Sequence, residues 1–169
     1  ISVFDPFLEP FGEYNVLLED PDRNEQGEDS GFEAIFFDNS TFYVVRESIR
    51  DENMTYHAVI VEVELDTDID VENAEYSEDH SCPTEFDFEG DSKGFEGAMP
   101  IHDLDGNLII LGLCEGNHCS QSKKLKQDKG NGRLVAMKET TLSDGSCIWK
   151  TLRVIKIPDS AYFGDYSAI

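Results

Sequence analysis

The chain has 169 residues, 39% of them hydrophobic, and a formal net charge of −23. This length suits one domain or part of a larger one, with enough apolar residues for a core. The charge argues against binding to nucleic acid or anionic membranes, because like charges repel. It favours either Ca²⁺ binding or a solvated acidic surface. No stretch approaches the roughly 20 apolar residues of a membrane-spanning helix.

The pattern along the first half of the chain predicts strands and no helices. Residues 31–37 and 41–47 form a hairpin around Asp38-Asn39-Ser40, and residues 56–65 are rich in β-branched side chains. We interpret the acidic stretch 66–83 as a long outer loop. The strands predicted in this half are 14–19, 31–37, 41–47, 56–65 and 84–88.

The second half repeats this arrangement. Gly94-Phe95-Glu96-Gly97 matches Gly31-Phe32-Glu33-Ala34, and a fainter copy begins at 165–169. The predicted strands are 94–101, 107–113, 133–138 and 148–157. Four strands per repeat, at a period of roughly 40–70 residues, are typical of β-propeller blades.

We therefore predict an all-β fold with two four-stranded antiparallel blades of a β-propeller. Residues 1–169 would be one partial domain, with blades at about 31–88 and 94–157 and the start of a third at 165–169. Two blades cannot close a ring, so the others would come from the same polypeptide or from other subunits. A β-sandwich is the alternative.

Glu33 and Glu96 are the first candidates for a functional site. Equivalent residues on the first strands of propeller blades meet in the central channel, where a ring of carboxylates can hold Ca²⁺. Each could instead accept hydrogen bonds from backbone N–H groups of a neighbouring blade. Glu47 and Glu115, at the ends of the second strands, could supply second ligands or acid–base groups.

The four cysteines allow three disulfide connectivities. Cys114 and Cys119 could close a short loop, in which case Cys82 and Cys147 would pair with each other. A zinc site made by Cys114, His118 and Cys119 is a weaker interpretation, because the spacing is not that of a zinc finger.

A basic loop follows Cys119. Its cations and the Gly130-Asn131-Gly132 backbone could bind a small anionic substrate or an acidic glycan. The loop could equally dock on an acidic protein surface. The basic residues are Lys123, Lys124, Lys126, Lys129 and Arg133.

Asn39-Ser40-Thr41 and Asn53-Met54-Thr55 are glycosylation sequons at predicted turns. Together with the even number of cysteines, they favour an extracellular or secretory-pathway protein. Ile1 at the first position suggests a processed or truncated start.

The Gly94–Gly97 opening and the Leu113-Cys114-Glu115-Gly116-Asn117 stretch resemble blades of the esterase-like phytase family. They are more loosely similar to calcium-dependent lactonase-like propellers. In those proteins a Glu-Gly motif points into the channel and often helps to bind metal, a role that the resemblance implies for Glu96. Glu33 is followed by Ala34 and matches only in part.

Three hypotheses follow. The first is a secreted, calcium-assisted propeller module for recognition or extracellular assembly, with a protein or glycan partner. The second is a metal-dependent phosphoesterase or lactonase-type hydrolase with Ca²⁺ in the channel. The third is a component of a large extracellular filament or complex. The sequence contains no nucleophile motif, P-loop or dinucleotide fingerprint.

Overall fold

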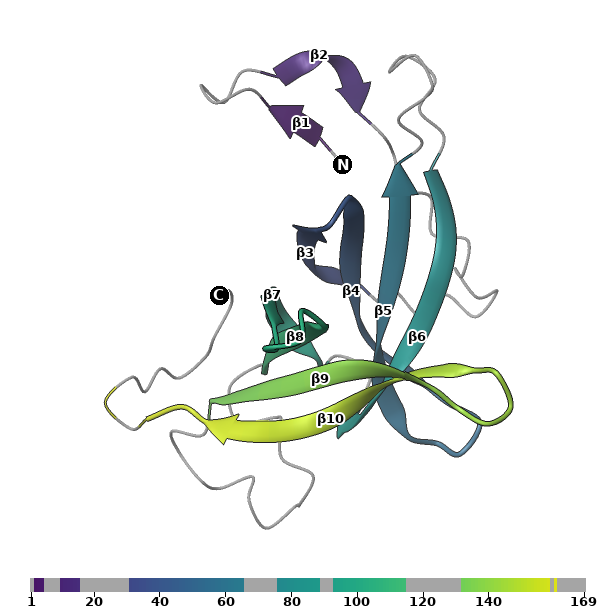
Figure 1. Cartoon of the computed structure of the whole chain (residues 1–169), viewed down its shortest axis with the longest axis vertical. Helices are drawn as coiled ribbons and strands as arrows, with labels where there is room; N and C mark the ends of the chain where they lie inside the picture. Colours follow the sequence, from purple (N-terminus) through teal and green to yellow (C-terminus); the bar gives the residue numbers. More distant parts are fainter. Residues whose placement is uncertain are drawn as a thin grey trace.

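The computed structural model describes residues 31–65, 76–88, 93–114, 132–158 and 160, together with the backbone of two short strands near the start. Those two strands, β1 (Ser2–Phe4) and β2 (Pro10–Asn15), pair with each other. The other strands that the structure describes form one eight-stranded sheet that nearly closes into a barrel (Figure 1).

The eight-stranded sheet consists of two consecutive antiparallel meanders. The first meander runs through β3 (Phe32–Asp38), β4 (Thr41–Arg50), β5 (Tyr56–Leu65) and β6 (Tyr76–Phe88). The second runs through β7 (Phe95–His102), β8 (Leu108–Cys114), β9 (Arg133–Thr141) and β10 (Cys147–Lys156). The two join where β6 and β10 pair in parallel at Thr84 and Trp149. At the other side β3 and β7 are in contact.

The predicted all-β class and the two four-stranded units are confirmed. Propeller blades as such are not, because the two units share one sheet through the β6–β10 pairing. Tyr14 and Asn15 of the predicted strand 14–19 lie in β2, and residues 16–19 lie outside the described residues. The predicted third copy at 165–169 lies outside the described residues.

The interpretation of 66–83 as a loop is wrong for its second part. Strand β6 begins at Tyr76 and pairs with β5 along its length. The polar residues that suggested a loop, such as Ser81, alternate with buried Cys82, Thr84 and Phe86. This period of two is typical of a strand with one buried face, and it was present in the sequence.

The main core lies between the two meanders. Cross-strand partners bring alternate residues of each meander to the facing surfaces, so that both contribute to one cluster. The Tyr43 and Trp149 rings meet edge to face across it, with centroids 6.4 Å apart. The two repeats therefore bury their hydrophobic faces against each other.

Phe95 is the central aromatic residue of this core. It is 0% exposed, and its ring lies 5.0 Å from that of Phe88 and 6.3 Å from that of Phe86. A Cβ added to Gly112, on the neighbouring strand β8, would come within 2.6 Å of the Phe95 ring. Gly112 is thus needed for the close approach of β8 to this ring.

Replacing Gly112 with Ala should lower the free energy of unfolding by about 1–3 kcal/mol, because the packed ring has no space to move into. Gly94→Ala is the matched control, since its added Cβ would meet its nearest atom at an ordinary 3.5 Å. Urea denaturation measures both. Equal stability of the two variants would contradict the packing described for Phe95.

The first meander is also apolar on its opposite face. Val44, Val59, Val61 and Val63 form a second buried cluster, with Phe42 packed against it. Ile35 and Phe37 of β3 are 51% and 55% exposed beside their cross-strand partners Val44 and Phe42. Both faces of this meander are therefore hydrophobic, as in the inner layers of stacked sheets.

The β7–β8 turn is fixed by Asp103. Its Oδ1 accepts hydrogen bonds from the backbone N–H groups of Asp105 and Asn107, and its Oδ2 accepts one from Lys138 Nζ at 3.2 Å. Hydrogen bonds from the Asn107 side chain and backbone, with smaller contributions from Lys138 and Asp105, lower the pKa of Asp103 from 3.8 to about 2.

Because this pKa is lower in the folded state, ionised Asp103 stabilises the fold above about pH 4, and this stability is lost as the pH falls towards 2. Asp103→Asn should therefore melt below the wild type at about pH 6, and the difference should shrink at about pH 2. Asp105→Asn, in the same turn, is the control. Melting curves across this pH range test the effect, and a constant difference would contradict it.

Candidate functional site

Three strands bring four potential metal ligands together. His80 and Cys82 are two residues apart on β6, so their side chains leave the same face of the strand. Glu139 on β9 pairs directly with Trp149, and Cys147 lies two residues before Trp149 on β10. The β6–β10 pairing at Thr84 and Trp149 then places these two faces side by side. We call His80, Cys82, Glu139 and Cys147 the four-residue cluster.

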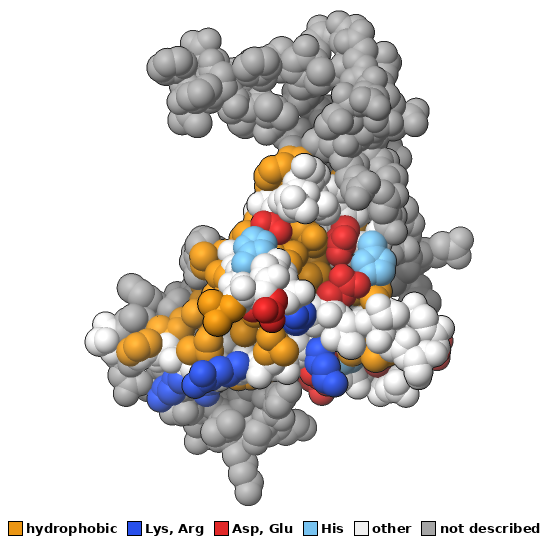
Figure 2. All heavy atoms as spheres, in the orientation of Figure 1, with side chains coloured by type: hydrophobic (Ala, Val, Ile, Leu, Met, Phe, Trp, Pro, Cys, Tyr) orange, Lys and Arg blue, Asp and Glu red, His pale blue; other side chains and the backbone are white. Residues whose placement is uncertain are grey.

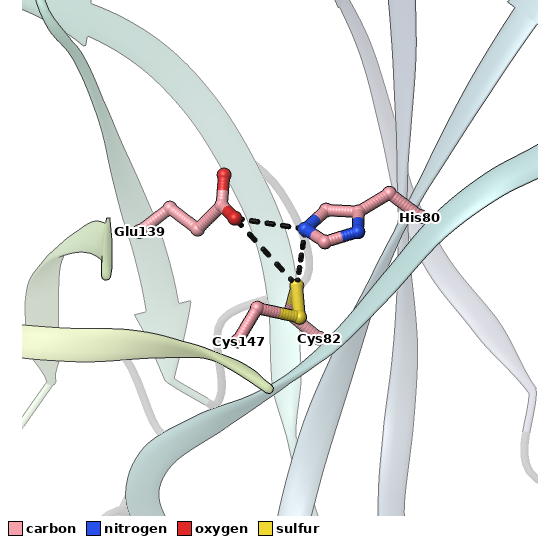
Figure 3. A group of neighbouring side chains, drawn as sticks. All are labelled: His80, Cys82, Glu139 and Cys147. Carbon is pink, nitrogen blue, oxygen red and sulfur yellow. Dashed lines mark hydrogen bonds and ion pairs between the residues drawn. A yellow bond between two sulfur atoms is a disulfide. The ribbon is translucent and has the colours of Figure 1, made fainter. Parts of the chain in front are cut away.

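Figure 3 shows the four side chains of the cluster converging. Cys82 and Cys147 form a disulfide with a Cα–Cα distance of 5.4 Å. His80 Nε2 lies 2.8 Å from Glu139 Oε1 and 3.0 Å from Cys82 Sγ. One ligand atom from each residue lies within 4.8 Å of every other. The cluster is the only such group of three or more His, Cys, Asp or Glu residues among those that the structure describes.

The disulfide determines which chemistry the cluster has in this state. A disulfide sulfur carries no hydrogen, so Cys82 Sγ cannot donate to Glu139. In the tautomer with the proton on Nε2, the His80 N–H donates to Glu139 Oε1, with Cys82 Sγ beside it. Thiolates, not disulfide sulfurs, bind metals. In the oxidised state the cluster is therefore a covalent link between β6 and β10, supported by a His–Glu pair.

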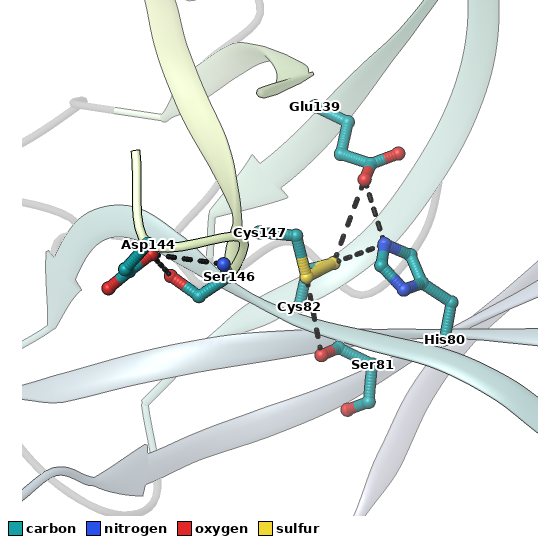
Figure 4. The surroundings of a disulfide bond; sticks show 7 residues. All are labelled: His80, Ser81, Cys82, Glu139, Asp144, Ser146 and Cys147. Atoms are coloured by element: carbon teal, nitrogen blue, oxygen red, sulfur yellow. Dashed lines mark hydrogen bonds and ion pairs between the residues drawn. A yellow bond between two sulfur atoms is a disulfide. The ribbon is translucent and has the colours of Figure 1, made fainter. Parts of the chain in front are cut away.

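The surroundings of the disulfide are ordered by a neighbouring turn (Figure 4). Asp144 Oδ1 accepts hydrogen bonds from the Ser146 backbone N–H at 3.0 Å and the Ser146 hydroxyl at 2.6 Å. These bonds lower the pKa of Asp144. Cys147 Sγ lies 3.6 Å from the Ser81 carbonyl oxygen. The turn therefore fixes the backbone directly before Cys147.

The disulfide assignment resolves the connectivity that the sequence left open for Cys82 and Cys147. Cys114 is also disulfide-bonded, while Cys119 and His118 lie outside the described residues. A zinc site that uses Cys114 as a thiolate is therefore wrong for this state, because its sulfur is already bonded.

A hollow lies where the β3–β4 and β7–β8 hairpins approach each other. Asp38, Tyr43, His102 and Leu108 line it, and His102 Nε2 lies 3.2 Å from Asp38 Oδ2. A second hollow adjoins it at Tyr43 and Leu108 and reaches Glu139 of the cluster. Figure 2 shows acidic and histidine side chains gathered on this face of the molecule. The cluster thus borders a depression of mixed polar and apolar lining, in which Asp38, Glu62 and Glu139 are the acidic residues.

The predicted channel carboxylates are placed on neighbouring elements. Glu33 on β3 and Glu96 on β7 are both partly buried, and β3 and β7 are in contact. Glu33 Oε1 and Glu47 Oε2 lie 3.1 and 4.0 Å from the position that a Cβ added to Gly31 would occupy. None of the three belongs to a described group of three convergent ligands. Their role in Ca²⁺ binding stays a prediction, and Glu115 lies outside the described residues.

The other predicted sites are described only in part. Arg133 begins β9 and is partly buried, but the four lysines of the basic loop, Lys123, Lys124, Lys126 and Lys129, lie outside the described residues. Asn39 and Asn53 both lie at exposed turns, and their glycosylation stays a prediction.

Sequence reasoning missed His80 and Glu139. His80 lay in the stretch interpreted as a loop, and Glu139 lay just after the predicted end of the strand 133–138. The signal available was the His80-Ser81-Cys82 spacing, which in a strand directs both side chains to one face. The approach of Glu139 depends on the pairing of β6 with β10, which no local pattern encodes.

Within the described residues, no helix has the length and hydrophobicity to cross a membrane. The Cys82–Cys147 disulfide fits an oxidising compartment. Comparison with family models, curated proteins and solved structures finds no match to this chain.

Proposed function

We propose that the chain forms part of a secreted, calcium-assisted β-propeller module that serves in recognition or extracellular assembly. The observation that carries this proposal is the packing of two like meanders against each other. Their first strands, β3 and β7, are in contact, and their last strands, β6 and β10, are linked by a disulfide. In a propeller the first strands of neighbouring blades likewise lie side by side around the channel, but there each blade is a separate sheet, whereas β6 and β10 here pair within one sheet.

The hydrophobic second face of the first meander supports the proposal. A blade within a ring is covered on both faces, whereas a sandwich sheet has one face towards water. Ile35 and Phe37 would contact the preceding blade, next to the Val44 cluster. The exposed residues Met99 and Ile155 of the second meander would contact the following one.

The ring arrangement has a direct test. Electron microscopy of the protein in the form that its source cell makes should show a disc with a central channel. A flat, two-layered particle without a channel would overturn the blade assignment and favour the sandwich.

Calcium binding would involve Glu33 and Glu96, which are partly buried on the contacting strands β3 and β7. Hard cations prefer such oxygen ligands. At a Ca²⁺ concentration a hundredfold above Kd, binding would add about 2.7 kcal/mol to the free energy of unfolding. For a chain of this size the melting temperature would rise by roughly 5–10 °C.

The test compares melting in Ca²⁺ and in EGTA, with Mg²⁺ at matched ionic strength to separate specific binding from screening of the negative charge. Glu33→Gln and Glu96→Gln should each reduce the calcium effect. Glu52→Gln, at an exposed turn, should leave it unchanged. Equal melting temperatures in Ca²⁺ and EGTA would remove calcium from the proposal.

A further inference from the structure

We propose that the Cys82–Cys147 disulfide is one of two states of the four-residue cluster. On reduction, His80, Cys82, Glu139 and Cys147 become a tetrahedral Zn²⁺ site. This site is separate from the Glu33–Glu96 region, and the outcome of the calcium experiment does not affect it.

The donor set of the reduced cluster matches zinc. It contains two thiolates, one imidazole and one carboxylate, which are the three kinds of ligand that Zn²⁺ takes from proteins. The thiolates exclude Ca²⁺ and Mg²⁺, which take oxygen ligands. Two thiolates and one carboxylate carry three negative charges against the two positive charges of the metal, which leaves the site with a net charge near −1.

Formation of the zinc site requires the two sulfur atoms to move apart and smaller shifts of the other ligand atoms. Ligand atoms of a tetrahedral zinc site lie about 3.3–3.8 Å apart, given bond lengths of about 2.0–2.3 Å. The cluster atoms already lie within 4.8 Å of one another. His80 Nε2 and Glu139 Oε1 lie 2.8 Å apart. On metal binding, the proton shared by these two atoms would leave and both atoms would bind the metal instead. Once the disulfide is broken, the two sulfur atoms would move apart to about 3.8 Å.

The strands hold the ligands in place without the disulfide. Glu139 and Cys147 are on two strands joined by an antiparallel ladder, and β10 also pairs with β6. The Trp149 side chain, 1% exposed, anchors this junction in the core. The β6 and β10 backbones around Cys82 and Cys147 would therefore remain close after the S–S bond is broken.

A metal ion and a reductant can both reach the cluster. The side chains of His80 and Glu139 are 41% and 34% exposed, and Glu139 lines the adjoining hollow. Cys82 is 0% exposed whereas Cys147 is only partly buried. An incoming thiolate would therefore attack Cys147 Sγ, and the Cys82 thiolate would leave towards the His80 N–H.

The reduction balances with a dithiol as reductant. Its first thiolate forms a mixed disulfide with Cys147 while the Cys82–Cys147 bond breaks. The second thiolate of the reductant then attacks the reductant's own first sulfur in the mixed disulfide. This step releases the Cys147 thiolate and leaves the reductant as an internal disulfide. Two electrons and two protons pass to the protein. Zn²⁺ binding then releases the two thiol protons to solvent.

Cobalt(II) titration of the reduced protein tests the proposal. The phosphine reductant TCEP replaces a dithiol in this experiment, because dithiols compete for the metal. The background variant Cys114→Ser/Cys119→Ser removes the other two thiols, with far-UV circular dichroism as the check on folding. We expect thiolate-to-cobalt charge transfer and the visible bands of tetrahedral Co²⁺, both lost on addition of Zn²⁺. The oxidised protein should show neither.

The ligand variants make the test specific. His80→Ala and Glu139→Ala should each weaken Co²⁺ binding by roughly a hundredfold or more, since even loss of outer-shell partners costs about 10–100-fold. His102→Ala and Glu52→Ala are the controls, as both are exposed residues outside the cluster, and they should leave the affinity unchanged.

If the background variant fails to fold, zinc X-ray absorption of the reduced wild type replaces it. Two sulfur and two nitrogen or oxygen ligands, with one light ligand lost in His80→Ala, would support the site. No binding by reduced, folded protein would overturn the proposal. So would binding that is unaffected by both His80→Ala and Glu139→Ala, because the metal would then be held elsewhere.

Discussion

Replacing both Cys82 and Cys147 with Ala should lower the free energy of unfolding by about 4 kcal/mol, mainly because the covalent cross-link is lost. The disulfide closes a loop with a sequence separation of 65 residues. In the chain-entropy description, a cross-link over a loop of this length removes about 4 kcal/mol of conformational freedom from the unfolded chain. For a chain of this size, the melting temperature should fall by roughly 8–16 °C.

Urea denaturation of the oxidised proteins measures this effect. His80→Ala is the matched control, because it disturbs the cluster but leaves the disulfide in place. The partly exposed His80–Glu139 pair should contribute less than about 1 kcal/mol. If the two variants lose the same stability, the covalent link does not hold the meanders together as described.

The two Phe residues of the repeated Gly-Phe-Glu motif should differ strongly when replaced by Ala. Phe95→Ala should lower the free energy of unfolding by about 3–5 kcal/mol, because it removes a fully buried ring and leaves a cavity beside Phe86 and Phe88. Phe32→Ala should cost about 1 kcal/mol or less. Its ring is 44% exposed and contacts the Arg46 guanidinium, 5.8 Å from the ring centroid.

Phe95→Leu removes the aromatic ring but keeps an apolar side chain at this buried position. Its free energy of unfolding should therefore lie between those of the wild type and Phe95→Ala. In the proposed ring, a preceding blade of a longer polypeptide would cover Phe32. The loss of free energy of unfolding in Phe32→Ala would then rise towards that in Phe95→Ala. Similar costs for both variants in the 169-residue chain itself would contradict the core as described.

The state of the Cys82–Cys147 pair would depend on where the proposed module works. As a disulfide it suits the secretory pathway or the cell exterior, where such bonds persist. In reducing surroundings the same residues would present the zinc site. The chain would thus keep β6 and β10 linked in either environment, by a covalent bond in one and by a metal in the other.

The sequence by itself determined the strands and their grouping. The β-branched run at 56–65 coincides with β5, and the repeated Gly-Phe-Glu anchors marked the first strand of each meander. These features are local: alternation, β-branched residues and turn residues act between near neighbours in the chain. The extension of β6 back to Tyr76 was also encoded locally, in the alternation from Ser81 to Phe88.

Only the tertiary structure decided what the strands bring together. Phe32 and Phe95 occupy equivalent places in the repeat, yet only Phe95 is buried, because only it has Phe86 and Phe88 packed against it. His80 and Glu139 are 59 residues apart in the chain and meet at 2.8 Å. That contact depends on the parallel pairing of β6 with β10, and the pairing depends on the fit of two hydrophobic faces rather than on any local pattern.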